Sequence, residues 1–181
     1  MMAFTYNSLP GPSRVVFGSG SLSQLAWEIK NIGCSRALIL TTPGQTRHGE
    51  AVKSIIGDLA VGLYNDATAH TPTGVTEDAA ELVKDLAVDC LVAIGGGSAI
   101  GLAKAIALRT NLPQIAIPTT YSGSEVCLVH LFFYQDRLVA LRQHPLWVKL
   151  RMAERQLRGH STSFRKSSFT TSPLRSHSLL E

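Results

Sequence analysis

Two kinds of hydrophobic segment alternate along the first two-thirds of the chain. In "SLSQLAWEIKNIG" (21–33), apolar residues such as Leu22, Leu25 and Ile29 recur at helical spacing, and Gly33 is placed to end the helix. In "RALILTTP" (36–43), by contrast, a short apolar run is uninterrupted and ends at a proline. Such a run is typical of a strand that is buried on both faces.

The order of these segments predicts an α/β fold. We expect strands at 36–43, 60–66, 90–94 and 114–118, and helices at 21–33, about 47–60, 77–87 and 98–110. Strands separated by helices require crossover connections, which predict a Rossmann-like open parallel sheet with helices on both faces. Thr76 is placed to cap the 77–87 helix. The residues before "GSGSL" (18–22) are a weak strand candidate, and we interpret Gly18 and Gly20 as turn glycines.

The charge balance changes near residue 126. Through Val126 the chain has 8 Lys/Arg against 10 Asp/Glu, and from Cys127 onward it has 9 against 3. Residues 137–159 fit a basic amphipathic helix interrupted at Pro145, and the Ser/Thr/Arg-rich residues 160–181 favour disorder. We therefore expect an α/β domain at residues 1–126 and an irregular basic tail at 127–181 that completes no further layer.

Composition narrows the classes of function. The excess positive charge belongs to the tail, so it does not point the α/β part toward nucleic acid or a membrane surface. Cys34, Cys90 and Cys127 are widely spaced and form no CxxC pair, which favours plain buried or semi-buried thiols over a disulfide framework or a zinc site. No secretory pattern opens the chain, and its longest tail run, "VCLVHLFFY" (126–134), is too short to span a bilayer. We expect a cytoplasmic protein.

Three consecutive glycines follow the predicted strand at 90–94. Glycine lacks a Cβ, so a phosphate can approach the main chain of Gly95, Gly96 and Gly97 closely. The first amides of the next helix have no partner within it, and its dipole adds positive charge at this end. We predict a phosphate site at these glycines and Ser98, which either caps the helix or donates to phosphate; the alternative is a tight turn without a ligand. Lys104 is interpreted as solvated or salt-bridged.

A second polar loop, "IPTTYSGSE" (117–125), ends the strand at 114–118. Ligands of open parallel sheets bind beyond the carboxyl ends of the strands. We therefore expect the loop to turn its hydroxyl groups toward the crevice that the glycines line; a loop that serves only for turning is the alternative. These hydroxyls belong to Thr119, Thr120, Tyr121, Ser122 and Ser124.

The loop after the first strand offers a further part of the same site. Thr41, Thr42 and Pro43 place hydroxyls, and no carboxylate, where an adenosine ribose would lie. A carboxylate there would repel a 2′-phosphate, so both NADH and NADPH are admissible.

Three stretches carry a family resemblance. "RVVFGSGSL", "HTPTGVT" and "CLVAIGGGSAIGLAKAIALRTNLPQIAIPTTYSGSE" together resemble the N-terminal domain of the iron-containing alcohol dehydrogenase superfamily, over about residues 4–126. Most members carry an aspartate at the position of Gly101. In having a glycine there, this chain resembles the maleylacetate reductase branch. The resemblance implies a dinucleotide domain followed by an all-helical domain, and reduction of maleylacetate, a small dicarboxylate, to 3-oxoadipate by NADH or NADPH in aromatic-compound degradation.

The resemblance also implies roles for the residues above. Gly95 to Ser98 would hold the pyrophosphate, Thr119 to Ser122 would lie along the cofactor toward the nicotinamide, and Thr41 to Pro43 would lie near the adenosine ribose. The metal ligands of the family, or the histidines replacing them, belong to the helical domain, which we do not recognise after Val126, where even the hairpin leading into it is not apparent. We therefore assign no metal ligand and no catalytic residue.

We expect a chain that ends before the helical domain to catalyse poorly, with a tail that derives from out-of-frame or intronic sequence. The resemblance also admits a homodimer. Two other readings stay open: a nucleotide-binding fragment without catalysis, and another member of the superfamily, such as a relative of glycerol or butanol dehydrogenase.

Overall fold

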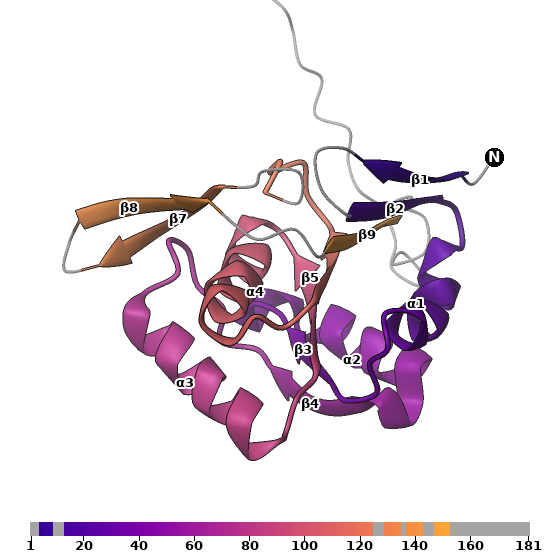
Figure 1. Cartoon of the computed structure of the whole chain (residues 1–181), viewed down its shortest axis with the longest axis horizontal. Helices are drawn as coiled ribbons and strands as arrows, with labels where there is room; N and C mark the ends of the chain where they lie inside the picture. Colours follow the sequence, from indigo (N-terminus) through magenta and orange to yellow (C-terminus); the bar gives the residue numbers. More distant parts are fainter. Residues whose placement is uncertain (1–3, 9–12, 125–128, 135–136, 143–146, 153–181) are drawn as a thin grey trace, which may run out of the picture.

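Short apolar strands form a sheet through the middle of the molecule, and helices pack on it (Figure 1). The computed structural model describes residues 4–8, 13–124, 129–134, 137–142 and 147–152, and side chains within 14–124. Its strands are β1 Phe4–Ser8, β2 Ser13–Gly18, β3 Ala37–Leu40, β4 Ala60–Tyr64, β5 Cys90–Gly95, β6 Gln114–Pro118, β7 Val129–Tyr134, β8 Arg137–Arg142 and β9 Trp147–Met152. Its α-helices are α1 Leu25–Asn31, α2 Thr46–Ile56, α3 Thr73–Asp85 and α4 Gly97–Thr110, with 3-10 turns at Ser21–Gln24, Pro43–Gln45 and Gly57–Leu59.

The main sheet has the strand order β1-β2-β9-β6-β5-β3-β4. Its strand pairs are parallel, except that β1 runs antiparallel to β2. From β3 the chain goes through α2 to β4, and then through α3 to β5 on the other side of β3. This reversal between β3 and β5 is a topological switch point, the position at which open α/β sheets bind ligands beyond the carboxyl ends of their strands.

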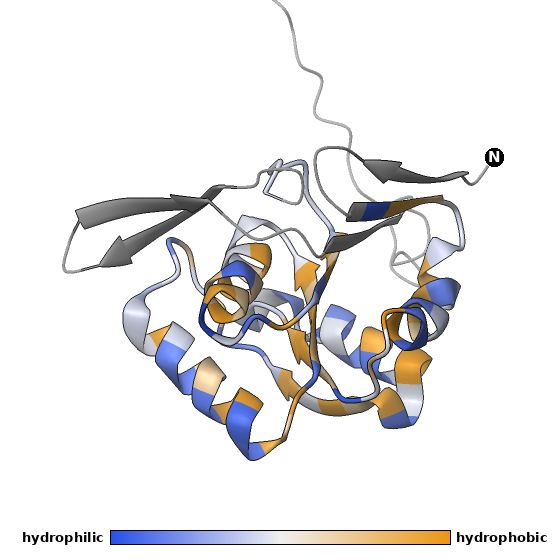
Figure 2. Cartoon of the chain, in the orientation of Figure 1, coloured by the Kyte–Doolittle hydropathy of each residue, from blue (hydrophilic) through white to orange (hydrophobic). Residues whose placement is uncertain are grey.

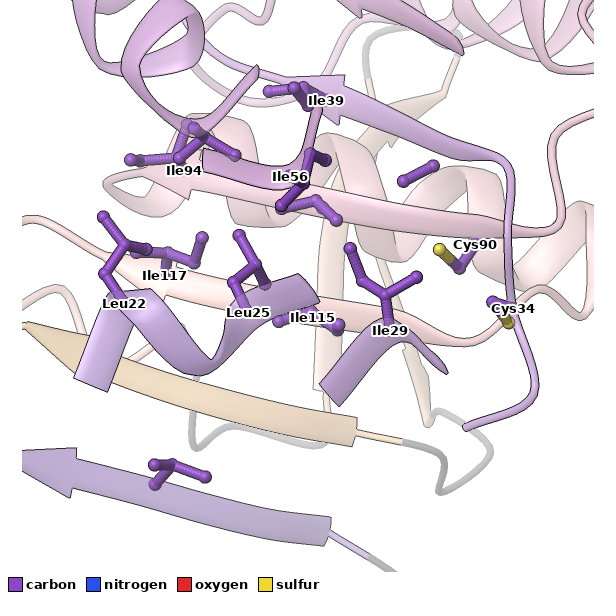
Figure 3. Close-up of a cluster of buried hydrophobic side chains, with 14 residues drawn as sticks. Leu22, Leu25, Ile29, Cys34, Ile39, Ile56, Cys90, Ile94, Ile115 and Ile117 are labelled. Atoms are coloured by element: carbon purple, nitrogen blue, oxygen red, sulfur yellow. The ribbon is translucent and has the colours of Figure 1, made fainter. Parts of the chain in front are cut away.

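Alternate residues of each central strand face opposite sides of the sheet, so the sheet has two core layers. On one face, Ile39, Val92 and Ile115 pack with residues of α1 and α2 (Figure 3). On the other face, Leu38, Leu91 and Ala116 pack with residues of α3 and α4. Figure 2 shows that apolar and hydrophilic residues both occur along α3, whereas the central strands are mostly apolar. Burial on both faces explains why these strands read as continuous apolar runs rather than alternating ones.

The predicted parallel α/β fold is confirmed between residues 21 and 118. The strands expected at 36–43, 60–66, 90–94 and 114–118 are β3 to β6. The first helix, α1, ends at Asn31, and Gly33 follows its C-cap Ile32 with a φ of 79°. Within the described part of the chain, each helix is too short or too polar to cross a bilayer.

The predicted cap of α3 is wrong. The helix begins at Thr73, directly after Pro72, rather than after Thr76. The amide of Thr76 already bonds to the carbonyl of Pro72, and its hydroxyl donates to the same oxygen at 3.2 Å. Proline fixes φ near the helical value and is favoured at helix starts, so the chain enters the helix one turn before the first acidic residue.

The tail differs most from its prediction. Residues 137–142 and 147–152 are strands, not parts of a basic helix. β7 and β8 form an antiparallel hairpin, the element expected of the family at this place but not recognised in the sequence. β9 pairs with both β2 and β6, so residues 147–152 belong to the main sheet. Hydrogen bonding to two strands outweighs the helical spacing of apolar residues here. The expected disorder at 160–181 lies outside the described residues.

At the amino-terminal ends of β3 and β5, Asp89 links the two strands through hydrogen bonds. Its carboxylate accepts hydrogen bonds from the amides of Ser35 (2.7 Å) and Arg36 (2.8 Å). Cys34 and Cys90 lie beside it as buried free thiols, as expected for plain core cysteines; Cys127 lies outside the described residues. Burial, and secondarily the charge of Asp89, raises the pKa of the Cys34 thiol. Burial, followed by the neighbouring Cys34, also raises the pKa of Cys90.

We expect Ile115→Ala to lower the free energy of unfolding by about 2–5 kcal/mol, because Ile115 is fully buried in the α1/α2 layer and its truncation leaves a cavity. Ile55, which is 40% exposed on α2, is the matched control, and Ile55→Ala should cost less than about 0.5–1 kcal/mol. Urea unfolding followed by circular dichroism measures both. Equal costs for the two variants would contradict the assigned core.

We expect the thiols of Cys34 and Cys90 to react slowly with a disulfide reagent at pH 8, because their raised pKa values leave little of the reactive thiolate and because both are buried. In a Cys127→Ser variant, labelling of the native chain should be at least about tenfold slower than labelling in urea. Labelling at the unfolded rate would show that this edge is not packed as described.

Candidate functional site

Three loops meet at the carboxyl ends of β3, β5 and β6. They are the turn that contains Gln45, the glycine corner (Gly95–Gly97), and the 119–124 loop. The amide of Thr119 donates to the carbonyl of Gly95 at 2.9 Å, and the Nε2 of Gln45 donates to the Oγ1 of Thr119 at 3.2 Å. The pairing of β5 with β6, in which Gly95 lies opposite Pro118, therefore brings together the two loops that the sequence predicted to share a site.

The three glycines of the corner have different reasons to be glycine. A Cβ on Gly95, whose φ is +150°, would lie 2.7 Å from the Oε1 of Gln45. A Cβ on Gly96 would lie 2.8 Å from the Oγ1 of Thr120. At Gly97 the nearest atom, on Ser122, would be 3.6 Å away, an ordinary contact. Neighbouring side chains thus crowd the Cβ positions of the first two glycines, whereas a Cβ at the third would be tolerated.

The N-terminus of α4 opens at this corner. The helix starts at Gly97, and Gly96 occupies its N-cap without a side-chain hydrogen bond. The first intrahelical bond runs from the amide of Ile100 to the carbonyl of Gly96, so the three preceding amides have no partner within the helix. No acidic residue lies in the first turn. These amides and the helix dipole favour a bound anion. Ser98 lies within the helix, so its predicted capping role is wrong.

Of the two alternatives predicted for Lys104, solvated or salt-bridged, the structure excludes the first. Lys104 is only 1% exposed, and its Nζ donates to the carbonyl of Ser124 at 2.6 Å. The side chain runs from the second turn of α4 to the end of the 119–124 loop. It therefore fixes that loop over the helix N-terminus. Lysine side chains are ordinarily exposed, so the sequence analysis did not predict this contact, although α4 is buried continuously from Ala99 to Ile106.

The side chains of the 119–124 loop are not equivalent. Thr119 is half-buried and bonded to Gln45, whereas Thr120 and Ser122 lie beside Gly96 and Gly97. Tyr121 is 82% exposed. Thr119, Thr120 and Ser122 are thus brought to the glycines, and Tyr121 is held at the surface.

The loop after β3 contains the predicted residues Thr41, Thr42 and Pro43, and also Gln45, which the sequence analysis missed. Thr41 is fully buried, and its hydroxyl donates to the carbonyl of Gln45 at 3.3 Å. Thr42 is half-buried and Pro43 is exposed, so they are the residues of this strand end that remain accessible. Gln45 contacts both other loops. Its position just before a helix, after a strand that ends at the site, is the only signal that could have identified it.

The described side chains offer one close group of potential metal ligands. Within residues 14–124, the close group of potential metal ligands is Cys34, Asp89 and Cys90. It lies at the amino-terminal edge of the sheet, opposite the three loops, and its carboxylate is already bonded to two amides. The described residues at the carboxyl edge do not present a ligand set for iron.

Comparison with known proteins agrees with this geometry. The model of the family "iron-containing alcohol dehydrogenase" matches residues 12–135. The chain belongs to the iron-containing alcohol dehydrogenase family. The maleylacetate reductase of Rhizobium sp. (strain MTP-10005) is 52% identical over 126 residues, which are 70% of this chain and 35% of that protein. The maleylacetate reductase of Sphingobium indicum is 48% identical over 125 residues.

Solved structures share the fold. The crystal structure of maleylacetate reductase from Agrobacterium tumefaciens superposes with a TM-score of 0.75 at 43% identity, covering 83% of this chain and 43% of that one. A sulfoacetaldehyde reductase from Bifidobacterium kashiwanohense, solved with NAD+, superposes with a TM-score of 0.67 at 21% identity. This chain spans about a third of the length of its curated relatives in the iron-containing alcohol dehydrogenase family.

We expect Gly96→Ala to lower the free energy of unfolding by about 1–3 kcal/mol, because the new methyl group overpacks the contact with Thr120. Gly74 of α3 has open space around its Cβ position, so Gly74→Ala is the matched control and should be neutral or stabilising by up to about 1 kcal/mol. Urea unfolding compares the two. A stabilising Gly96→Ala would mean that the 119–124 loop does not lie against the glycines.

Proposed function

We propose that this chain binds NADH or NADPH at the carboxyl ends of β3, β5 and β6 and serves as the cofactor domain of a maleylacetate reductase. The observation that carries the proposal is the N-terminus of α4 at the glycine corner, where three amides have no partner in the helix and the helix has neither a side-chain cap nor an acidic residue in its first turn. A diphosphate carries the negative charge that such a helix end stabilises. The switch point between β3 and β5 is the position at which this class of sheet binds nucleotides.

The names of the most similar listed relatives support maleylacetate as the substrate. The proteins that share about half of their aligned residues with this chain are named maleylacetate reductases. That activity reduces the carbon–carbon double bond of a small dicarboxylate, as expected in the degradation of aromatic compounds. The nicotinamide, when bound, supplies the hydride. The relative of the same fold that was solved with NAD+ supports a nicotinamide dinucleotide as the cofactor.

The residues of this chain bind and orient the cofactor. The amides of Gly97, Ser98 and Ala99 would hold the diphosphate. Thr120 and Ser122 would contact the part of the cofactor that extends toward the nicotinamide. Lys104 keeps the 119–124 loop in place through Ser124, so the hydroxyl groups are fixed before the cofactor arrives, which limits the entropy lost on binding.

We propose that NADH and NADPH are both accepted. Of the three residues predicted to lie near the adenosine ribose, Thr42 and Pro43 are accessible and Thr41 is buried. A carboxylate at this place would select NADH, because it would bond to the ribose hydroxyl and repel a 2′-phosphate. The hydroxyl of Thr42 is uncharged, so it neither repels a 2′-phosphate nor selects the free ribose hydroxyl as a carboxylate would.

A second candidate is nucleotide binding without turnover. It is favoured by the described residues at the carboxyl edge of the sheet, which offer a site for an anion but no ligand set for iron. The two candidates differ in one measurement, the oxidation of NADH or NADPH in the presence of maleylacetate. Turnover supports the reductase; binding of the nucleotide with no turnover supports the second candidate.

We expect Gly97→Asp to weaken the binding of both reduced nicotinamides by about 100-fold or more, because the new carboxylate would lie at the helix end that holds the diphosphate and repel it. Gly74→Asp introduces the same charge at the first turn of α3 and should leave binding unchanged. Fluorescence titration with NADH and NADPH measures both variants. Unaltered binding by Gly97→Asp, or no binding of either nucleotide by the unmodified chain, would overturn the proposed site.

A further inference from the structure

The side-chain amide of Gln45 has one atom that forms a hydrogen bond and one that does not. Its Nε2 donates to the hydroxyl of Thr119 at 3.2 Å. Its Oε1 is buried and has no hydrogen-bond partner among the residues that the structure describes. Buried polar atoms are ordinarily paired, so this unpaired atom requires an explanation.

The unsatisfied end is aimed at the glycine corner. Oε1 lies 2.7 Å from the position that a Cβ on Gly95 would occupy. The main chain of Gln45 is fixed from both sides, since its amide donates to the carbonyl of Thr42 at 2.9 Å and its carbonyl accepts from Thr41. The side-chain amide is therefore held between the corner and the 119–124 loop.

The pair of Gln45 and Thr119 can exchange its hydrogen bond without moving. A half-turn of the amide about its last torsion exchanges Oε1 with Nε2. The hydroxyl of Thr119 accepts a hydrogen bond in one orientation and donates one in the other. The end facing the corner is thus an acceptor in one state and an N–H donor in the other, while the contact with Thr119 persists in both.

We propose that Gln45 is a ligand of the cofactor's diphosphate, an inference that rests on the proposed function. When the diphosphate binds, the amide turns, its Nε2 donates to a phosphate oxygen, and its Oε1 accepts from Thr119. A phosphate oxygen accepts hydrogen bonds and does not donate at neutral pH, so only the turned amide satisfies both. The residue also connects the loops after β3, β5 and β6. Nucleotide affinity therefore depends on how these three loops are arranged.

The test uses adenosine diphosphate ribose, which carries the diphosphate and both riboses but no nicotinamide, together with NADPH. We expect Gln45→Leu to weaken the binding of both probes by about tenfold, the loss expected for a hydrogen bond to a charged group. Gln45→Glu should weaken it further at pH 8, because a carboxylate cannot donate and repels phosphate. Part of the loss should be recovered at about pH 5, because burial and the phosphate charge both raise the pKa of a carboxyl at this place, and the protonated carboxyl can donate.

The matched control lies at the opposite edge of the same sheet. Gln114, the first residue of β6, is also buried and also has an unpaired Oε1. Gln114→Leu and Gln114→Glu should change the affinity for either probe by less than about twofold. Urea unfolding of all four variants establishes that each is folded at the temperature of the titration.

The outcomes separate this inference from the proposed function. If the unmodified chain binds both probes and the Gln45 variants bind them equally well, the inference is overturned while the nucleotide site stands. If the unmodified chain binds neither probe, both are overturned. If the Gln45 variants do not fold, NMR of the unmodified chain decides: the side-chain amide signals of Gln45 should shift on addition of adenosine diphosphate ribose, those of Gln114 should not, and an unshifted Gln45 overturns the inference.

Discussion

The parallel pairing of β5 with β6 is the interaction on which the site depends. It places Gly95 opposite Pro118, and the hydrogen bond from the Thr119 amide to the Gly95 carbonyl continues the pairing one residue beyond the strands. The loop that follows each strand must therefore start at the same edge. Because β3 pairs with β5 in the same direction, the turn that carries Gln45 is brought there as well. Side chains 74 residues apart in the sequence, those of Gln45 and Thr119, meet for this reason.

The core holds these strands in register from both faces. Their side chains alternate between the α1/α2 layer and the α3/α4 layer, and both layers consist of closely packed aliphatic residues. At the far edge, Asp89 joins the starts of β3 and β5 through the amides of Ser35 and Arg36. Slippage of a strand would break both layers and this contact, so the positions of the loops are determined by packing that is remote from them.

Buried polar contacts refine what the sheet establishes. The side chain of Lys104 is buried, and its Nζ donates a hydrogen bond to the carbonyl of Ser124. Gln45 brings an amide to the glycines. Both contacts limit the freedom of the loops around the N-terminus of α4, where an anion is favoured. A preformed, rigid arrangement of donors is what nucleotide binding requires, because ordering the loops at the time of binding would reduce affinity.

By itself the sequence determined the class of the fold, the central strands and the position of the glycine corner. These follow from local properties: uninterrupted apolar runs, helical spacing, and glycines between a strand and a helix. It did not determine the partners of single polar residues. Lys104 has the same local pattern whether it is solvated or buried, and Gln45 is one polar residue among several after a strand. Nor did it identify β9, whose strand conformation depends on pairing with β2 and β6 from distant parts of the chain. Such contacts depend on which segments pack together, and only the tertiary structure decides that.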